Sequence, residues 1–175
     1  MIDVLIDSDL PWDSITVWQV DERVAPAGHA ARNSNQLVNL VCKVKLMPVT
    51  SRDLRAAARR YASSLPDRFD VIHLGLGDDG HTASWPPGNE DLLRSQRRIE
   101  LVPEFNRWRR MTLTKRVVNA ARTRGVLAVG TSKRTMVERW LLDDARLPIS
   151  AIRRTGTVVF LDHAAGPAAL ADSGG

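Results

Sequence analysis

The stretch LGLGDDGHTASWPPG, residues 74–88, combines residue types that could carry out acid–base chemistry. Histidine is the residue type best suited to proton transfer near neutral pH, and His81 is the only histidine in the stretch. Asp79 could orient its imidazole or stabilise the protonated form. Gly77 and the neighbouring glycines would let the backbone turn sharply and approach a ligand closely. A polar turn with an exposed histidine has the same composition, so the location of the stretch in the fold must distinguish the two.

Three other segments carry charged groups that could bind an anionic substrate. The DER segment, residues 21–23, supplies two carboxylates and a guanidinium, and Arg23 could clamp a phosphate or carboxylate through paired hydrogen bonds. Lys133 ends the segment GTSK at the start of a predicted helix, where free N–H groups and the helix dipole favour a phosphate. Arg110 begins the segment RMTLT. Each residue could equally be a solvated surface charge or belong to a surface ion pair.

The chain around these segments alternates between predicted strands and helices. Apolar and β-branched runs predict strands over residues 15–20, 44–49, 69–74, 98–102, 110–113, 125–129 and 157–161. Apolar spacing and capping residues predict helices over residues 30–43, 52–64, 114–123 and 132–142. We therefore predict an α/β protein, one domain over residues 1–175 with a three-layer, Rossmann-like, mostly parallel sheet flanked by helices. The alanine- and glycine-rich tail, residues 163–175, is expected to fray.

The DER segment, the histidine stretch and GTSK all come directly after predicted strands, which end at Val20, Leu74 and Val129. In open α/β sheets, ligands bind beyond the carboxyl ends of the strands. Three loops at such ends can converge on one crevice. Their shared location favours a binding site over three unrelated polar turns.

The composition limits the possible classes of function. The chain has 175 residues, a net charge of +5, four histidines and a single cysteine, Cys42. One cysteine excludes an internal disulfide framework and a Cys-rich zinc site, and the histidines lack HxH or HExxH spacing, so we expect no metal. No apolar run approaches the roughly 18 residues that a membrane span needs. The N-terminal sequence lacks the features of a signal peptide, so we expect a cytoplasmic protein without a membrane partner.

Other ligand classes have weaker support. Gly75, Gly77 and Gly80 have GxGxxG spacing, but Gly80 directly precedes His81 and no downstream acidic residue suits a ribose contact, which argues against a dinucleotide cofactor. The absence of GxSxG argues against a nucleophile-elbow hydrolase. Acidic residues are interleaved with the basic ones, so we expect no nucleic-acid partner. Binding of nucleic acid through the arginine-rich surface is an alternative, and it predicts strongly salt-dependent affinity.

A set of segments occurs in the same order as in a known family. They are VWQVDERVAP with RNSNQL (17–26, 32–37), FDVIHLGLGDDGHTASWPPG (69–88), RMTLT (110–114), VLAVGTSK (126–133) and LPISAI with LDHAA (147–165). In these segments the chain resembles the 6-phosphogluconolactonase family, a relative of the glucosamine-6-phosphate deaminases. The resemblance covers most of the chain, and DGHTAS is its most specific part. It implies hydrolysis of 6-phospho-D-glucono-1,5-lactone to 6-phosphogluconate in the oxidative pentose phosphate pathway, without a metal or organic cofactor.

The resemblance also implies roles for individual residues. His81 would be the general base that activates water to attack the lactone carbonyl, and Asp79 would support it. The residues expected to bind the substrate are Asp21, Arg23, Ser34, Asn35, Gly77, Arg110 and Lys133. Among these, Lys133 would contact the phosphate, while Ser34 and Asn35 would shape the rim of the pocket.

Two departures bear on these expectations. Deaminases usually carry an acidic residue five positions after this histidine, and Pro86 stands there, which favours a lactonase over a deaminase-like isomerase. The family usually begins with an extra strand and a Gly-Gly-Ser-type phosphate loop, and no such segment precedes Val20. We therefore expect a sheet truncated at its N-terminus relative to the family, in a monomer or weak homo-oligomer whose ligand is the phosphorylated sugar lactone. A non-catalytic phosphosugar-binding module, or an inactive fragment, is the alternative.

Overall fold

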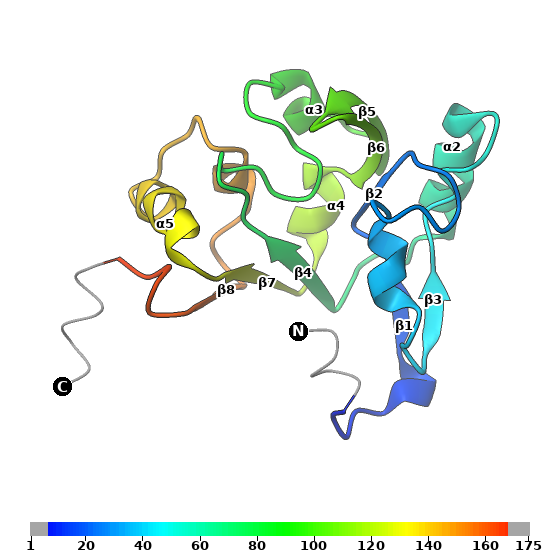
Figure 1. Cartoon of the computed structure of the whole chain (residues 1–175), viewed down its shortest axis with the longest axis horizontal. Coiled ribbons are helices and arrows are strands. Elements are labelled where there is room, and N and C mark those ends of the chain that lie inside the picture. The colour runs from blue at the N-terminus through cyan, green and yellow to red at the C-terminus, as the bar shows by residue number, and fades with distance from the viewer. Residues whose placement is uncertain (1–6, 168–175) are drawn as a thin grey trace.

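The computed structural model describes residues 7–167 and contains short strands, short helices and 3-10 turns (Figure 1). The strands are β1 (Thr16–Trp18), β2 (Asp21–Arg23), β3 (Lys43–Lys45), β4 (Val71–Gly75), β5 (Ile99–Phe105), β6 (Trp108–Leu113), β7 (Thr123–Ala128) and β8 (Thr157–Leu161). The helices are α2 (Leu54–Ser64), α3 (Glu90–Arg94), α4 (Lys115–Ala120) and α5 (Arg134–Leu141). The 3-10 turns are η1 (Trp12–Ser14), η2 (Asn33–Leu37), η3 (Thr131–Lys133) and η4 (Pro148–Ala151). The expected fraying of residues 163–175 falls mostly outside the described residues.

The described strands form three small sheets. One is the parallel sheet β4-β7-β8, the second is the parallel pair β1-β3, and the third is β2-β6-β5, in which both strand pairings are antiparallel. Figure 1 shows α2 and α5 at opposite ends of this arrangement. The α/β class with parallel sheets flanked by helices is thus confirmed, but the strands are divided among three sheets.

The antiparallel hairpin β5–β6 has a local cause. Phe105 pairs with Trp108, so only Asn106 and Arg107 connect the two strands. Both residues have positive φ angles, 49° and 69°. This is the backbone of a tight hairpin turn, and so short a connection can only join antiparallel strands.

The predicted helix over residues 30–43 is wrong. The structure has only the turn η2 there, and residues 38–42 form no helix. Val38 and Val41, which would have formed the apolar face, are 73% and 64% exposed. The backbone N–H groups of Asn33 and Ser34 donate to the Glu22 side chain. The segment is therefore ordered by a tertiary polar contact and not by an amphipathic helix face.

Helix α2 fixes the end of the β1–β3 pair. Asp53 caps the helix by accepting a hydrogen bond from Ala56 N at 2.9 Å. The buried Tyr61 hydroxyl lies 3.0 Å from the carbonyl oxygen of Gln19 and 3.1 Å from that of Lys45. This contact holds the chain at the point where it enters the DER strand β2.

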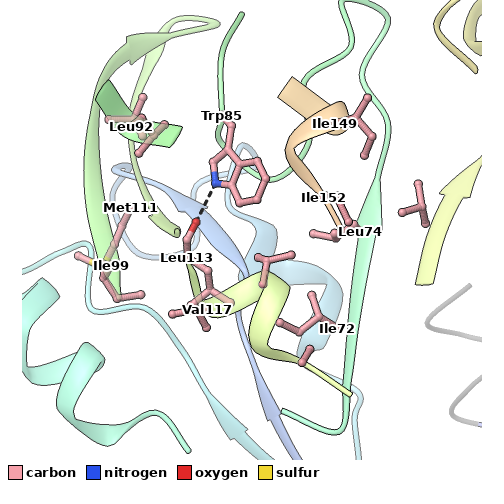
Figure 2. Packing of buried hydrophobic residues seen from close by; sticks show 14 of the residues in the cluster. Ile72, Leu74, Trp85, Leu92, Ile99, Met111, Leu113, Val117, Ile149 and Ile152 are labelled. Atoms are coloured by element: carbon pink, nitrogen blue, oxygen red, sulfur yellow. Dashed lines mark hydrogen bonds between the residues drawn. The ribbon is translucent and has the colours of Figure 1, made fainter. Parts of the chain in front are cut away.

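The loop after β4 is anchored in the core by Trp85, which is completely buried. Its indole Nε1–H donates to the Leu113 carbonyl oxygen at 2.8 Å. Figure 2 shows the ring between the Met111–Leu113 side of the hairpin and the side that carries Ile149 and Leu74. The indole therefore ties the loop to β6 and packs it against the β4 sheet.

The two faces of the sheet β4-β7-β8 differ in burial. Ile72, Leu74 and Val126 point into the core and are at most 3% exposed. On the other face, Val71 is 64% and Phe160 is 53% exposed. Parallel sheets are usually covered on both faces, so this apolar exposure is unusual.

None of the helices within residues 7–167 has the length and hydropathy to cross a bilayer.

We expect Trp85→Ala to lower the free energy of unfolding by about 3–5 kcal/mol, because it leaves a large cavity. Trp85→Phe should cost less, about 1–3 kcal/mol, because it mainly removes the bond to the Leu113 carbonyl. Trp12→Ala, at a half-exposed position, is the control and should cost about 1 kcal/mol or less. Urea unfolding of the three variants measures these values. Equal losses for Trp85→Ala and Trp12→Ala would contradict the anchoring role.

Candidate active site

The centre of the DER segment is a fully buried carboxylate, Glu22. Its two oxygens receive N–H groups from the Gln19 side chain (2.9 Å) and from the backbones of Arg23 (2.8 Å), Asn33 (2.8 Å) and Ser34 (2.9 Å). Arg32 Nε lies 3.0 Å from Glu22 Oε2 in a buried ion pair. Burial alone would raise the pKa of Glu22, but these donors together lower it below its ordinary value. Glu22 is therefore an anion that holds the chain together, and it is not available to a ligand.

Asp21 points to the other side of the same strand. Its carboxylate accepts a hydrogen bond from the Ser84 hydroxyl at 2.6 Å and lies 3.8 Å from Arg110 Nη1. Burial raises the pKa of Asp21, while the Ser84 hydrogen bond and the charges of Arg110 and Arg23 oppose that rise. Ser84 belongs to the loop after β4, so this bond joins the DER strand directly to the histidine stretch.

Two arginines flank Asp21. Arg23 Nη1 donates to the carbonyl oxygen of Ala31 at 2.9 Å and to Asn33 Oδ1 at 2.6 Å, while its side chain stays half-buried. Arg110 is 4% exposed and donates through Nε to the Phe105 carbonyl oxygen at 3.0 Å. Burial and the nearby Arg23 charge lower the pKa of Arg110. Both guanidiniums are thus fixed in direction by carbonyl or amide oxygens.

His81 lies at the other end of the loop, paired with Asp79. The distance from His81 Nδ1 to Asp79 Oδ1 is 2.5 Å, and the same oxygen accepts the His81 backbone N–H at 3.0 Å. The carboxylate oxygen can only accept, so Nδ1 is the donor, and in the neutral imidazole Nε2 then keeps its lone pair. Burial tends to raise the pKa of Asp79, but its bonds to His81 lower it overall. Asp79 therefore fixes both the tautomer and the direction of the imidazole.

Gly77 makes room for that imidazole. A Cβ atom on Gly77 would lie 2.0 Å from His81 Nδ1, so the imidazole would have to move to make room for it. The turn is closed by hydrogen bonds from Gly77 N to His81 O (2.8 Å) and from Gly80 N to Gly77 O (3.0 Å). Gly80 has a φ of +84°, which favours glycine. The glycines therefore set the position of the histidine directly.

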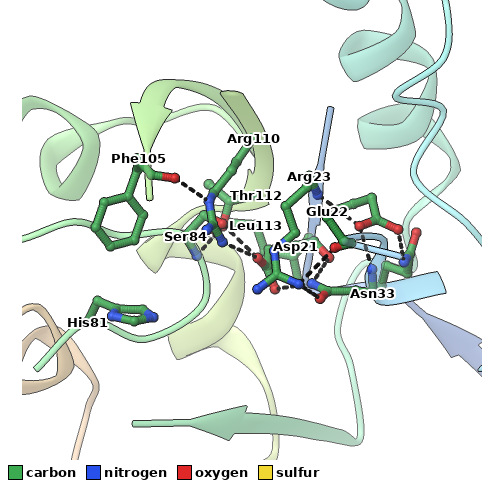
Figure 3. A network of polar contacts seen from close by, with 12 residues as sticks. Asp21, Glu22, Arg23, Asn33, His81, Ser84, Phe105, Arg110, Thr112 and Leu113 are labelled. Atoms are coloured by element: carbon green, nitrogen blue, oxygen red, sulfur yellow. Dashed lines mark hydrogen bonds and ion pairs between the residues drawn. The ribbon is translucent and has the colours of Figure 1, made fainter. Parts of the chain in front are cut away.

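Phe105 lies next to both functional halves. Its ring centroid is 5.1 Å from that of His81, edge to face, and 5.1 Å from the Arg110 guanidinium carbon. In Figure 3 the imidazole lies on the side of Ser84 and Arg110, and Glu22 and Asn33 lie on the far side of Asp21. The hairpin thus supplies one aromatic ring that contacts both the imidazole and the buried arginine.

Lys133 belongs to a third group, at the ends of β4 and β7. Its ammonium lies 2.5 Å from Asp78 Oδ1, and the Ser132 hydroxyl donates to the same oxygen at 3.0 Å. These contacts, that of Lys133 first, lower the pKa of Asp78. Lys133 is therefore close to the histidine loop, as expected, and its charge is paired with Asp78.

The sequence of this chain is similar to those of known proteins. The model of a protein family described as Glucosamine-6-phosphate isomerases/6-phosphogluconolactonase matches residues 1–160. The chain belongs to this family. A 6-phosphogluconolactonase of Pseudomonas aeruginosa is 30% identical, over 87% of this chain and 72% of that protein. The GDH/6PGL endoplasmic bifunctional protein of Oryctolagus cuniculus is also 30% identical, over 89% of this chain but only 22% of that protein.

Solved structures agree with this assignment. The crystal structure of a 6-phosphogluconolactonase from Shewanella baltica has a TM-score of 0.81 and 27% identity, and the match covers 91% of this chain and 77% of that one. The Rossmann-like fold of this family is therefore shared. A monomeric glucosamine-6-phosphate deaminase superposes with a TM-score of 0.78 at 20% identity, which supports the fold alone.

The structure brings together most of the residues predicted for this 6-phosphogluconolactonase-like site. Asp21, Arg23 and Arg110 form one group with Ser84, while Asp79 and His81 form a second. Asn35 belongs to neither group. It is exposed, and its side-chain amide donates a hydrogen bond to the His29 carbonyl oxygen at 3.0 Å. Ser34 is fixed through its backbone N–H, which donates to Glu22.

Sequence reasoning missed four residues of the site, namely Glu22, Asn33, Ser84 and Phe105. Asn33 and Ser84 lie inside the RNSNQL and DGHTAS segments, so their location was a usable signal. Glu22 lies inside the DER segment as well, but its burial is not visible there, and nothing in the local sequence distinguishes Phe105 from an ordinary strand residue. Among residues 7–167 no group of three His, Cys, Asp or Glu side chains is arranged to hold a metal ion.

We expect Glu22→Gln to lower the free energy of unfolding at pH 7 by about 3–5 kcal/mol, because Arg32 stays buried without its counter-charge. The folded-state pKa of Glu22 is lowered, so its stabilising effect is complete above the ordinary value of 4.5 and disappears as the pH falls through the folded value. The difference between wild type and Glu22→Gln should therefore shrink in acid.

The matched control is Glu90→Gln, which removes an exposed ion pair with Arg94 and should change the free energy by about 0.5 kcal/mol or less. Denaturant unfolding between pH 3 and pH 7 measures both variants. A pH-independent effect of Glu22→Gln, or one equal to that of Glu90→Gln, would show that the buried carboxylate does not stabilise the fold in this way.

Proposed function

We propose that this chain hydrolyses 6-phospho-D-glucono-1,5-lactone to 6-phosphogluconate. The observation that carries the proposal is the Asp79–His81 pair, which holds the imidazole through Nδ1 on the loop that follows the parallel strand β4, and Ser84 bonds that same loop to Asp21. Family membership supports the same reaction, since two relatives named above, at 30% and 27% identity and matched along most of their length, are 6-phosphogluconolactonases. The chain covers 72–77% of those relatives.

The reaction needs one proton acceptor and no covalent intermediate. His81 Nε2 removes a proton from water as the water oxygen attacks the lactone carbonyl carbon, which gives a tetrahedral oxyanion. The carbonyl is re-formed as the bond from C1 to the ring oxygen breaks, and the imidazolium returns its proton to that ring oxygen. The new carboxylic acid then ionises in water. Asp79 stabilises the imidazolium between the two proton transfers.

Charged groups near the imidazole would bind the anionic parts of the substrate. Arg23 and Arg110 are held in fixed directions, so they can stabilise negative charge without reorganising. Asp21 lines the same group and restrains Arg110. Lys133 would contact the phosphate, far from the reacting carbon, and so orient the ring. Ser34 and Asn35 would line the rim of the pocket. They are the outermost residues that we propose to contact the substrate.

The proposal also covers the cellular compartment, the oligomeric state and the partners of the protein. We place it in the cytoplasm as a monomer or weak homo-oligomer, without a nucleic-acid or membrane partner. The single half-buried Cys42 supports a reducing compartment, because it offers no internal disulfide. Sedimentation of the purified chain would measure its oligomeric state.

We expect His81→Ala to reduce kcat by about 10²–10⁴-fold in an assay on freshly generated lactone, corrected for spontaneous hydrolysis. Asp79→Asn should give a loss in the same range, because the amide can donate to Nδ1 and so move the proton to Nε2. His163→Ala, at an exposed histidine, is the control and should keep full activity.

Equal turnover by wild type and His81→Ala would refute the catalytic role. If neither turns over, calorimetry with 6-phosphogluconate identifies the remaining possibility: binding would indicate a non-catalytic phosphosugar-binding module, and no binding would exclude both. Release of ammonia from glucosamine 6-phosphate would support the deaminase alternative, which Pro86 disfavours at the position where deaminases usually carry an acid.

Gly77→Ala should reduce kcat/KM by about 10²-fold, because its Cβ would displace the His81 imidazole and small displacements of a catalytic group are costly. Gly75→Ala, two residues away, meets no atom within 4 Å of the new Cβ and is the matched control. The lactone assay, with thermal unfolding to confirm folding, measures both. If the two variants were equally active, the imidazole position would not depend on Gly77.

A further inference from the structure

Two neighbouring aspartates on the loop after β4 face different functional groups. Asp79 pairs with His81, whereas Asp78 Oδ1 lies 2.5 Å from Lys133 Nζ and accepts the Ser132 hydroxyl at 3.0 Å. The ammonium proposed to meet the substrate phosphate is therefore already paired with an anion of the same chain. The Asp78 side chain is 67% exposed and that of Lys133 is 23% exposed.

We propose that Asp78 is an internal competitor for the phosphate-binding group, displaced from Lys133 and Ser132 when a phosphorylated ligand binds. This inference rests on the phosphate contact of Lys133 in the proposed function. Its consequence is that Asp78 weakens the binding of phosphorylated substrate and product alike, and so speeds the release of product. In the empty site it keeps Lys133 and Ser132 ordered.

The balance of interactions favours displacement by phosphate. An exposed ammonium–carboxylate pair is weak because water screens both charges. A phosphate ester carries a charge of about −1.5 to −2 near pH 7 and offers three acceptor oxygens. It can therefore replace both contacts of Asp78 and gain more from the ammonium than a carboxylate does. A neutral sugar lactone has no charge with which to displace Asp78.

Displacement leaves the rest of the site in place. The turn that carries Asp78 is fixed by the backbone bonds between Gly77, Gly80 and His81. Because the Asp78 side chain is mostly exposed, it can rotate into water without moving that backbone. The adjacent Asp79–His81 pair then keeps its geometry while the counter-ion of Lys133 is exchanged.

The test is calorimetry of Asp78→Asn with 6-phosphogluconate and with inorganic phosphate at low salt. We expect Kd to fall roughly three- to tenfold for both ligands, since the carboxylate that competes with the phosphate for Lys133 is removed. In the lactone assay KM should fall by a similar factor. Asp70→Asn, which removes an exposed ion pair with Arg122, is the matched control and should leave both values unchanged.

A double-mutant cycle shows whether the effect acts through Lys133. In a Lys133→Ala background, Asp78→Asn should no longer strengthen binding; a gain that persists there would overturn the proposal. An unchanged or higher Kd for Asp78→Asn alone would also overturn it, because Asp78 would then be neutral or would position Lys133 for the ligand. The binding measurement does not depend on turnover, so wild type that binds without hydrolysing lactone would refute the proposed reaction alone.

Discussion

The architecture of the site depends on one buried carboxylate. Glu22 stands in the middle of β2 and collects N–H donors from its own strand and from residues 32–34. Those donors would otherwise need partners of their own in a segment that forms no regular helix. By fixing Asn33, the contact also fixes Arg23, whose guanidinium donates to the Asn33 side chain. The charged half of the site is thus built outward from an anion that never meets the ligand.

The proposed catalytic half is attached to this centre through the loop after β4. Trp85 anchors the loop in the core, and Ser84 places it against Asp21, so both constraints act on adjacent residues. Gly77 then leaves room for the His81 imidazole, which packs edge to face against Phe105. The short distance along the chain from Trp85 to His81 explains how a loop side chain can be held as firmly as one on a strand.

The sequence predicted correctly those features that depend on short, local patterns of residues. The α/β class followed from the alternation of strands and helices, and the histidine loop does contact the DER segment, as predicted. DER was expected as a loop after a strand ending at Val20, but it is itself the strand β2, paired antiparallel with β6. The helix expected over residues 30–43 failed because its apolar spacing was real but Val38 and Val41 had no core to face. Glu22 was not recognised, because burial of a charge depends on donors that are distant in the sequence or belong to the backbone.

The functional groups share one electrostatic arrangement, in which an aspartate accompanies each proposed cation or base. Asp21 lies beside Arg110, Asp79 beside His81 and Asp78 beside Lys133. The burial of these carboxylates differs: Asp21 is largely enclosed and bonded to Ser84, Asp79 is half-exposed, and Asp78 is mostly in water. A buried pair is costly to separate, while an exposed one exchanges easily. The graded burial therefore suits the proposed site, in which the arginine and the proposed base stay fixed while the proposed phosphate contact of Lys133 is exchanged.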